Sequence, residues 1–472
     1  MSNFVGRAED FARIQEHLDV VAATGVGRLL VVRGRRQVGK SRLASEFVAK
    51  AGLPSLFFTG SRQSDPARDL GLLSAEAQRS STLPGANLLA QSRPSSWDDA
   101  LRILAAMIPA DQPSIVVLDE FPWLLESDPG LDGTLQVVWD REFERRPVLM
   151  ILIGSDIATM EVLSAHGKPL FGRTREMVIR PFSPRDTARM CGLLDQPAEG
   201  FDTYLVTGGY PRLTAEAARF KTLDGFINNQ LSDEHSDLAV MAQRTLSAEF
   251  PSDSAASAVL RAIGAGERTF RNIGAASQLG DMAVHRALDL LELKKVVARD
   301  QPASVPSSNQ PRYRVEDSYL RFWLSLIEPV LSEIARGRSD LAKRRFAQSW
   351  LPWRGRAIEP VVRDALTRLS LDDPRLQGAG HVSGWWPRSN NPEVDLVGVD
   401  RIERPSQVLF VGSIKWRETE PFGSNDLAEL SRDASLVPGV TEGTTKIVVS
   451  RTGVTTPDVV EFGPADLLQA WV

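Results

Sequence analysis

The residues best suited to chemistry stand close together in the stretch RLLVVRGRRQVGKSRL, residues 28–43. Gly34, Gly39, Lys40 and Ser41 follow the order G-x-x-x-x-G-K-S. Two glycines at this spacing let the backbone curl so that its N–H groups face a phosphate chain. The lysine would reach the β- and γ-phosphates, and the serine hydroxyl would ligate Mg²⁺. The spacing therefore predicts a loop that binds a nucleotide, for which we expect ATP, together with Mg²⁺.

The sequence on both sides of this loop fits the prediction. An apolar run, 29–32, leads into the loop, and a helix-prone segment, 43–51, leads out of it, which gives the required order of strand, loop and helix. The start of the helix would add its partial positive charge. The alternative is a glycine-bearing turn that binds nothing. The residues expected to contact the nucleotide are Gly34, Gln37, Val38, Gly39, Lys40, Ser41 and Arg42.

A second segment supplies two acids that such a site needs. SIVVLDEFPWL, residues 114–124, is an apolar run that ends in Asp119 and Glu120. Parallel strands buried on both faces have continuous apolar runs, and ligands bind at their carboxyl ends. Asp119 would hold Mg²⁺ through water, and Glu120 would polarise the attacking water. An apolar strand ending in two acids is usually only a strand end, but the loop upstream favours the catalytic interpretation.

These residues must be positioned by a sheet, and the chain offers five candidate strands. They are 28–33, 54–60, 114–119, 147–156 and 176–184. Helical or looped segments separate them, which predicts an α/β fold with a parallel sheet covered by helices. Ser155, at the end of the fourth strand, could sense the γ-phosphate or could be an ordinary turn serine, and both interpretations stay open.

Length and composition limit the remaining possibilities. A chain of 472 residues predicts about three domains, and 42% hydrophobic with 24% charged residues is typical of a globular protein in water. The formal charge of −5 argues against binding DNA through a bulk positive field, although a local basic patch is compatible with it. Cys191 is the only cysteine, so no internal disulfide can form. Without an apolar run near the ~20 residues of a membrane span, or an apolar signal core, we expect a cytoplasmic protein without a membrane partner.

The order of motifs resembles the archaeal-type prokaryotic ATPases of the AAA+/STAND group of P-loop NTPases. The segment FVGRAEDFARIQEHL, 4–18, is similar to the leading box of that family, where the resemblance implies that the chain beside Val5 borders adenine and that Arg7 shapes the turn. The segment LIGSD, 152–156, is similar to the family's sensor strand. The resemblance therefore adds Val5 and Arg7 to the nucleotide-binding residues.

Two further motifs extend the resemblance. In FGRTREMVIRPFSP, 171–184, Arg173 or Arg175 stands where such families place an arginine finger, although either could be a surface cation. The segment GGYPRLT, 208–214, resembles the signature of the helical lid, in which Pro211 would approach the base. The resemblance implies an ATPase core over 1–190, a helical lid over 191–247, a winged helix over 248–330 and a nuclease-like domain over 331–472.

The winged helix is the part in which DNA contact is considered. Apolar residues recur at helical spacing along 284–293, and the outward face would present His285 and Arg286, with Arg271 nearby. These few basic residues would attract DNA only weakly. The alternative is that this region packs against the rest of the protein and relays the nucleotide state. In 312–330, the helical spacing of Tyr319 and Phe322 predicts core packing.

The C-terminal part resembles the PD-(D/E)xK nuclease-like domain attached to these ATPases. Its candidate residues are Glu359 on an expected helix over 353–366, Glu393 and Asp395 on an expected strand over 384–400, and Lys415 on a strand over 408–418. Such chemistry needs two carboxylates for Mg²⁺ and a lysine. The usual glutamate two residues before the lysine is Ser413 here, so one metal ligand is missing and a degenerate domain is expected. Glu393, two residues from Asp395, is the candidate substitute ligand, and the alternative is a retained fold used for docking.

Three functions follow from this sequence. The leading prediction is a slow, Mg²⁺-dependent ATPase that acts as a nucleotide-driven switch. The alternatives are a DNA-binding regulator tuned by ATP, with DNA on the winged helix or the C-terminal domain, and an ATP-gated nuclease. An unidentified protein partner and a homo-oligomer are compatible with all three.

Overall fold

The computed structural model describes residues 6–250, 254–305 and 310–472. It divides into two compact units, Met1–Pro181 and Phe182–Val472, which are described here one at a time. Val5, expected beside the adenine, lies outside the described residues. In the ranges that are described, no helix has both the length and the apolar character needed to cross a membrane.

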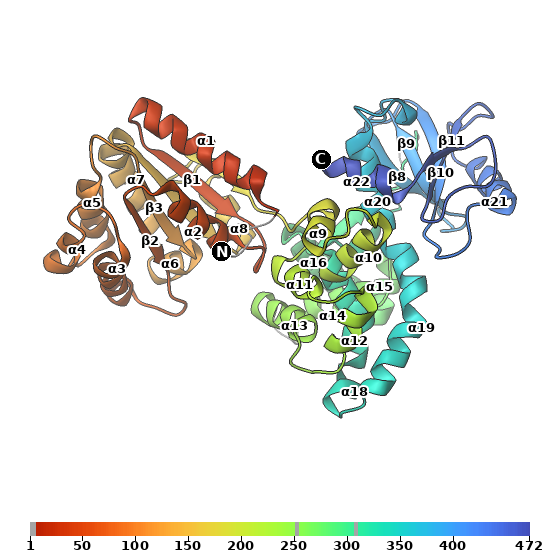
Figure 1. Cartoon of the computed structure of the whole chain (residues 1–472), viewed down its shortest axis with the longest axis horizontal. Coiled ribbons are helices and arrows are strands. Elements are labelled where there is room, and N and C mark those ends of the chain that lie inside the picture. The colour runs from red at the N-terminus through yellow and green to blue at the C-terminus, as the bar shows by residue number, and fades with distance from the viewer. Residues whose placement is uncertain (1–5, 251–253, 306–309) are drawn as a thin grey trace. The chain divides into compact units, whose positions relative to one another are not determined.

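The first unit is built on a five-stranded sheet in the order β2-β3-β4-β1-β5, in which every neighbouring pair is parallel (Figure 1). The strands are β1 (Arg28–Arg33), β2 (Ser55–Thr59), β3 (Ser114–Asp119), β4 (Val148–Gly154) and β5 (Thr174–Val178). The strand β4 therefore lies between β1 and β3. Because the strands are parallel, their carboxyl ends share one edge of the sheet.

Helices cover both faces of this sheet, as the alternating pattern predicts. They are α1 (Ala8–Thr24), α2 (Lys40–Ala51), α3 (Pro66–Ser80), α4 (Asn87–Ser92), α5 (Trp97–Met107), α6 (Phe121–Ser127), α7 (Leu131–Arg141) and α8 (Ile157–Leu163). The helices α3, α5, α6 and α7 share one buried core with side chains of β1 to β4. The helix α1 packs against α2, where the rings of Phe11 and Phe47 lie 5.0 Å apart. The predicted α/β fold is confirmed for this unit.

The fifth strand begins and ends earlier than predicted. The expected range was 176–184, whereas β5 spans Thr174–Val178. Pairing with β1 ends when the Ile179 N–H donates to the Arg33 carbonyl at 2.8 Å. The following Pro181 has no N–H to donate, so the chain leaves the sheet there.

The second unit begins with a group of helices and continues with three helices and a ribbon. The first group comprises α9 (Pro184–Cys191), α10 (Pro197–Thr207), α11 (Pro211–Ala217), α12 (Leu223–Gln230) and α13 (Asp237–Glu249). Next come α14 (Ala255–Gly264), α15 (Phe270–Ser277), α16 (Asp281–Leu293), β6 (Val297–Asp300) and β7 (Arg312–Val315), with β6 and β7 antiparallel. The segment 284–293, where helical spacing was expected, lies within α16.

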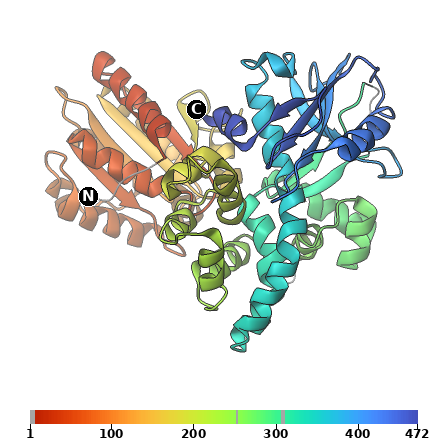
Figure 2. The same cartoon turned by 45° about the vertical axis from the view of Figure 1, so that its right-hand side comes forward.

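Aromatic side chains fill the centre of the next segment. It contains α17 (Ser318–Phe322), a π-helical turn η2 (Trp323–Ile327), a short 3-10 turn η3 (Glu328–Val330), α18 (Leu331–Ala335) and the long α19 (Ser339–Ala357). Tyr319 and Phe322 are buried, which confirms that their helical spacing reflects core packing. The helix α19 runs from α18 to α20 (Glu359–Leu369) beside the C-terminal sheet (Figure 2).

The C-terminal sheet has five strands in the order β12-β11-β10-β9-β8. They are β8 (His381–Trp385), β9 (Val394–Val399), β10 (Val408–Lys415), β11 (Thr445–Ser450) and β12 (Val460–Phe462). The helices α20 and α22 (Pro464–Leu468) share a core with one face, and α21 (Ser424–Ala434) shares a core with the other. The sheet is mixed, with β8, β9 and β10 antiparallel and β10, β11 and β12 parallel.

Two predicted elements of this part were wrong in their extent. The expected strand over 384–400 is two antiparallel strands joined by the segment 386–393, because Pro387 and Pro392 cannot donate to a ladder. The expected helix over 353–366 is divided at Ile358 into α19 and α20. Pro360 has no N–H, which suits the first turn of α20 but not the interior of a helix. Glu359 therefore opens a helix, and Glu393 precedes β9 rather than lying within it.

Candidate nucleotide-binding site

The loop between β1 and α2 has the backbone that its glycines predict. Gly34, Gln37 and Gly39 adopt φ values of 157°, 65° and 93°. A Cβ on Gly34 would lie 2.2 Å from the Ile179 carbonyl oxygen, so no larger residue fits. The loop is therefore curled tightly against the end of β5, with Val38 buried and Gln37 exposed at its turn.

The start of α2 is open to an anion. Gly39 caps the helix without a side-chain hydrogen bond, and the first turn contains no acid. The first N–H groups of an α-helix have no partner within the helix and carry a partial positive charge. Ser41 and Arg42 are exposed in this turn, and the Arg42 guanidinium lies 3.5 Å from the Glu46 carboxylate.

Lys40 is buried at the base of the loop. Its Nζ donates to the carbonyl oxygens of Gly34 and Arg35, each at 2.8 Å. Burial lowers the pKa of Lys40 to about 8, and the nearby Glu120 and Asp119 partly oppose that shift. The ammonium group is thus desolvated beside the open helix end, where a phosphate would compensate for its lost hydration.

Asp119 is joined to the loop by Ser41. The Ser41 side chain hydrogen-bonds to the Asp119 carboxylate, which also accepts the Glu120 N–H at 3.0 Å. Burial raises the pKa of Asp119, and the Ser41 hydrogen bond opposes the shift. The two residues predicted for Mg²⁺ are therefore in contact.

This donor set fits Mg²⁺ rather than a metal held by protein alone. Over the described ranges, no three His, Cys, Asp or Glu side chains are grouped to hold a metal ion. Mg²⁺ is commonly held by one or two protein oxygens while phosphates and water complete its shell. The hydroxyl of Ser41 and the carboxylate of Asp119 supply that number.

Glu120 and Ser155 form a pair that the sequence did not reveal. Ser155 Oγ donates to the Glu120 carboxylate, with distances of 2.7 and 3.0 Å to Oε1 and Oε2. Glu120 has a φ of 50°, in the left-handed region that residues with a side chain adopt infrequently. Because β4 lies beside β3, the end of the fourth strand comes next to the two acids.

Arg7 supports the loop through its backbone contacts. Its guanidinium is buried and donates to the Val38 carbonyl at 2.6 Å and to the Arg180 carbonyl at 2.7 Å. It also pairs with Asp10 at 2.9 Å. Arg7 therefore joins the loop to the chain just after β5, and its role beside a bound nucleotide stays a prediction.

The two candidate finger arginines lie away from the carboxyl edge of the sheet. Arg175 pairs in register with Leu30, which is the third residue of β1 and stands three residues before Arg33. At about 3.3 Å per residue this is roughly 10 Å short of the carboxyl edge. Arg173 holds Asp140 through two hydrogen bonds of 2.6 and 2.7 Å. Arg175 is exposed, and it donates to the Thr174 carbonyl at 3.3 Å.

Pro211 belongs to the second unit, where it opens α11. The preceding Gly209 has a φ of 70°, and a Cβ there would lie 2.1 Å from the Phe182 carbonyl oxygen. Tyr210 Oη donates to Asp317 at 2.6 Å. The glycine signature therefore has a packing reason of its own, and the approach of Pro211 to the base stays a prediction.

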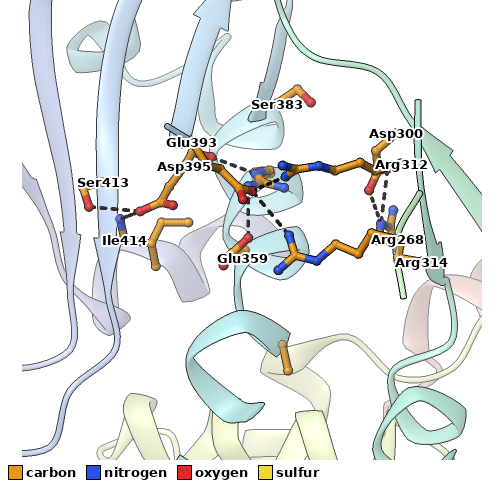
Figure 3. Close-up of polar contacts among 12 residues, drawn as sticks. Arg268, Asp300, Arg312, Arg314, Glu359, Ser383, Glu393, Asp395, Ser413 and Ile414 are labelled. Carbon is orange, nitrogen blue, oxygen red and sulfur yellow. Dashed lines mark hydrogen bonds and ion pairs between the residues drawn. The ribbon is translucent and has the colours of Figure 1, made fainter. Parts of the chain in front are cut away.

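The C-terminal carboxylates are occupied by other groups. Asp395 Oδ2 accepts the Ser413 hydroxyl at 3.0 Å and the Ile414 N–H at 2.9 Å (Figure 3). Glu359 pairs with Arg363 at 3.1 Å. Asp395 is thus bonded into its own sheet, where Ser413 stands in the place of a carboxylate.

Glu393 and Lys415 likewise have partners elsewhere. Arg312 pairs with Glu393 at 2.7 Å, and Arg268 approaches the same oxygen at 3.4 Å. Lys415 Nζ lies 3.6 Å from Asp426 and 3.6 Å from Glu429. Sequence reasoning missed both arginines. The alternation in RYRV, 312–315, places charged residues on one side of a strand and could have drawn attention to Arg312, whereas Arg268 lies outside any such pattern.

Comparison with known proteins gives a partial match at the C-terminal end and a distant match over most of the chain. Residues 323–427 match DUF234, a family of archaeal and bacterial proteins of unknown function. An uncharacterized protein of Methanocaldococcus jannaschii is 22% identical over 444 residues, which cover 91% of this chain and 90% of that protein.

Solved structures with a similar chain course include archaeal ATPases. The Walker-type ATPase PABY2304 of Pyrococcus abyssi is 17% identical with a TM-score of 0.49, covering 68% of this chain and 96% of that one. The ORC2 protein of Aeropyrum pernix, solved with ADPNP and ADP, is 16% identical with a TM-score of 0.42, covering 72% and 98%.

Proposed function

We propose that the first unit binds ATP with Mg²⁺ and hydrolyses it slowly. The observation that carries this proposal is the buried Lys40, which stands beside an uncapped helix start and the paired Ser41 and Asp119. A cation, open N–H groups and metal-binding oxygens converge there, as a triphosphate with Mg²⁺ requires. When bound, Mg²⁺ would neutralise negative charge on the phosphates.

Within this proposal each residue of the site has a separate role. Lys40 exchanges the carbonyls of Gly34 and Arg35 for phosphate oxygens, and Ser41 with Asp119 holds the metal. Glu120 orients and polarises the attacking water as a general base. Because Ser155 holds the Glu120 carboxylate, the base must be released before it can accept a proton from water. That requirement supports slow turnover and a nucleotide-driven switch.

A finger arginine would have to come from a second copy of the chain. Arg173 and Arg175 lie away from the carboxyl edge of the sheet and from Lys40, so neither supports a role within one chain. Arg175 is the better candidate because Arg173 is held by Asp140. The proposal therefore includes assembly of the ATP-bound protein, in which the ATPase rate per chain rises with protein concentration.

The DNA-binding alternative receives less support from the charges on α16. The exposed side chains of this helix include His285 and Arg286, but Asp281 and Asp289 are exposed on it too. Balanced charge gives little attraction to a phosphate backbone. The nuclease alternative also receives little support, because Glu359 and Glu393 are paired with arginines.

The decisive test is equilibrium binding of labelled ATP to Lys40→Ala. Loss of binding, with an unchanged circular dichroism spectrum, is expected because a neutral side chain cannot replace the charge at the phosphates. Lys50→Ala is the matched control, since Lys50 is exposed at the other end of the same helix. Equal ATP affinity in wild type and Lys40→Ala would overturn the proposal.

A further inference from the structure

The second unit contains a cavity of about 430 Å³ that the ATP site does not involve. It lies where the end of α14, the strand β7, the π-helical turn η2 and the junction of α19 with α20 come together. Its most notable feature is its charged lining. Six arginines line it: Arg268, Arg312, Arg314, Arg321, Arg356 and Arg363.

The acids in the lining balance only half of this charge. They are Asp300, Glu359 and Glu393. Each is paired: Asp300 with Arg314 at 2.9 Å, Glu359 with Arg363 at 3.1 Å, and Glu393 with Arg312 at 2.7 Å. Six guanidiniums against three carboxylates leave a net charge of +3 when all are ionised, and Figure 3 shows several of these pairs side by side.

Two of the arginines have no acidic partner. Arg321 donates through Nη2 to the Ala357 carbonyl at 2.5 Å, while its buried Nε has no hydrogen-bond partner. Arg356 is exposed and makes no hydrogen bond or ion pair with the part of the chain that the structure describes. A buried guanidinium donor without an acceptor is unfavourable by about 1–3 kcal/mol or more. An anion in the cavity would supply that acceptor.

The cavity also has the size and the walls of a small-molecule site. A volume of about 430 Å³ lies within the usual range for such sites. Trp353, Trp386 and Tyr313 add aromatic surface to the lining. Trp386 stacks on Arg312, whose guanidinium lies 4.2 Å from the ring centre, and this holds the guanidinium plane in place. Several fixed guanidiniums are suited to phosphate oxygens because each presents paired donors.

We propose that this cavity is a second anion site, which binds a small molecule carrying two or more phosphate groups. The charge of the ligand matches the surplus of three guanidiniums, and the confined volume favours a small polyphosphate over a nucleic-acid chain. Arg321 and Arg356 supply the unused donors, and Arg268 joins them because its contact with Glu393 is long, at 3.4 Å.

A substitution at Glu359 tests the proposal in the opposite direction, because it should strengthen anion binding whereas loss of an arginine should weaken it. Burial raises the pKa of Glu359 to about 7, with nearby Asp395 and Glu393 adding to the shift and Arg363 opposing it. The Glu359 carboxylate lines the cavity, where burial and two nearby carboxylates disfavour its charged form. Replacing it with a neutral amide removes one negative charge and frees Arg363, so an anion should bind more tightly.

The experiment is calorimetric titration of the full chain with inorganic tripolyphosphate at pH 8. The Lys40→Ala background removes the phosphate site of the first unit, so one remaining site per chain is expected. Arg356→Ala should weaken this binding about tenfold, the effect of losing one charge-assisted contact. Glu359→Gln should tighten it several-fold. Arg344→Ala is the matched control, because Arg344 is exposed on the same helix but outside the cavity lining, and it should bind as the background does.

The outcomes distinguish polyphosphate binding in the cavity from binding at the ATP site and from binding of nucleic acid. Absence of tripolyphosphate binding, or equal binding in the Arg356, Glu359 and Arg344 variants, would overturn the proposal. Binding of a 5′-phosphorylated oligonucleotide without any binding of tripolyphosphate would also overturn it and would assign the cavity to nucleic acid. Because the ATP proposal is tested with ATP and Lys40→Ala alone, either proposal can fail while the other stands.

Discussion

The loop site of the first unit and the carboxylate cluster of the C-terminal sheet differ in how their charges are partnered. At the loop, the acceptors of Lys40 within the described ranges are both carbonyl oxygens, and Gly39 caps the helix that follows without a side-chain hydrogen bond. In the C-terminal cluster, Glu359 and Glu393 already have guanidinium partners. Residues typical of a functional motif are present in both regions. The difference lies in their partners: in the part of the chain that the structure describes, the charge of Lys40 has no ionic partner in contact with it, whereas the two carboxylates of the C-terminal cluster are neutralised by arginines.

The largest effect should come from removing the proposed base. Glu120→Gln keeps the shape of the side chain and its contact with Ser155, so ATP should bind as in wild type. Hydrolysis should slow by ~10²-fold or more, since the amide cannot accept a proton. Single-turnover kinetics with labelled ATP measure both steps. The exposed Glu126 of α6 gives the control Glu126→Gln, and unchanged turnover in Glu120→Gln would place the base elsewhere.

The opposite expectation applies to the C-terminal cluster. Wild type and Asp395→Ala should both show no cleavage of single- or double-stranded DNA with Mg²⁺ or Mn²⁺. The substitution should instead lower the free energy of unfolding by about 1–3 kcal/mol, because it leaves the buried Ile414 N–H without its acceptor. Denaturant titration measures this loss. Cleavage by wild type that disappears in Asp395→Ala would show that the cluster is catalytic despite Ser413.

A pH series would sharpen the contrast further. Because the pKa of Lys40 is about 8 in the free protein and a bound phosphate would raise it, ATP binding above pH 8 must be accompanied by uptake of a proton. ATP affinity should therefore be steady just below pH 8 and fall by about tenfold by pH 9. Equilibrium binding across this range measures it, and a flat profile to pH 9 would show that Lys40 stays charged in the free loop.

The smallest expected effect distinguishes the two interpretations of Ser155. If its hydroxyl restrains Glu120, Ser155→Ala should raise the ATPase rate by about fivefold, the equivalent of ~1 kcal/mol for one hydrogen bond. If its hydroxyl instead contacts the γ-phosphate, the same change should slow hydrolysis. Steady-state ATPase assays with saturating ATP give the sign directly.

The sequence predicted the parts of the site that depend on local order. The spacing from Gly34 to Ser41 and the apolar run before Asp119 predicted the loop and two strands without further information, and they singled out Ser41 and Asp119 as the proposed Mg²⁺ ligands. The contact of Ser155 with Glu120 could not be predicted in the same way, because it depends on β4 lying beside β3. Strand order is set by packing of the whole sheet rather than by any local pattern.

The C-terminal region was harder to predict for related reasons. Its expected strand over 384–400 contains Pro387 and Pro392, which turn the chain between β8 and β9. The arginine-lined cavity draws on residues from 263 to 393, which are distant in sequence and come together only through the fold. Such a site has no signature spacing, so the sequence alone could not indicate it.

Arg7 gives the loop a direct mechanical link to the point where the chain leaves the first unit. One guanidinium holds both the Val38 carbonyl in the loop and the Arg180 carbonyl, and the first unit ends at the next residue, Pro181. A shift of Val38 must therefore either break a hydrogen bond of 2.6 Å or pull on the backbone at Arg180. The Val38 carbonyl in the loop and the backbone at Arg180 are thus tied to each other by a single side chain.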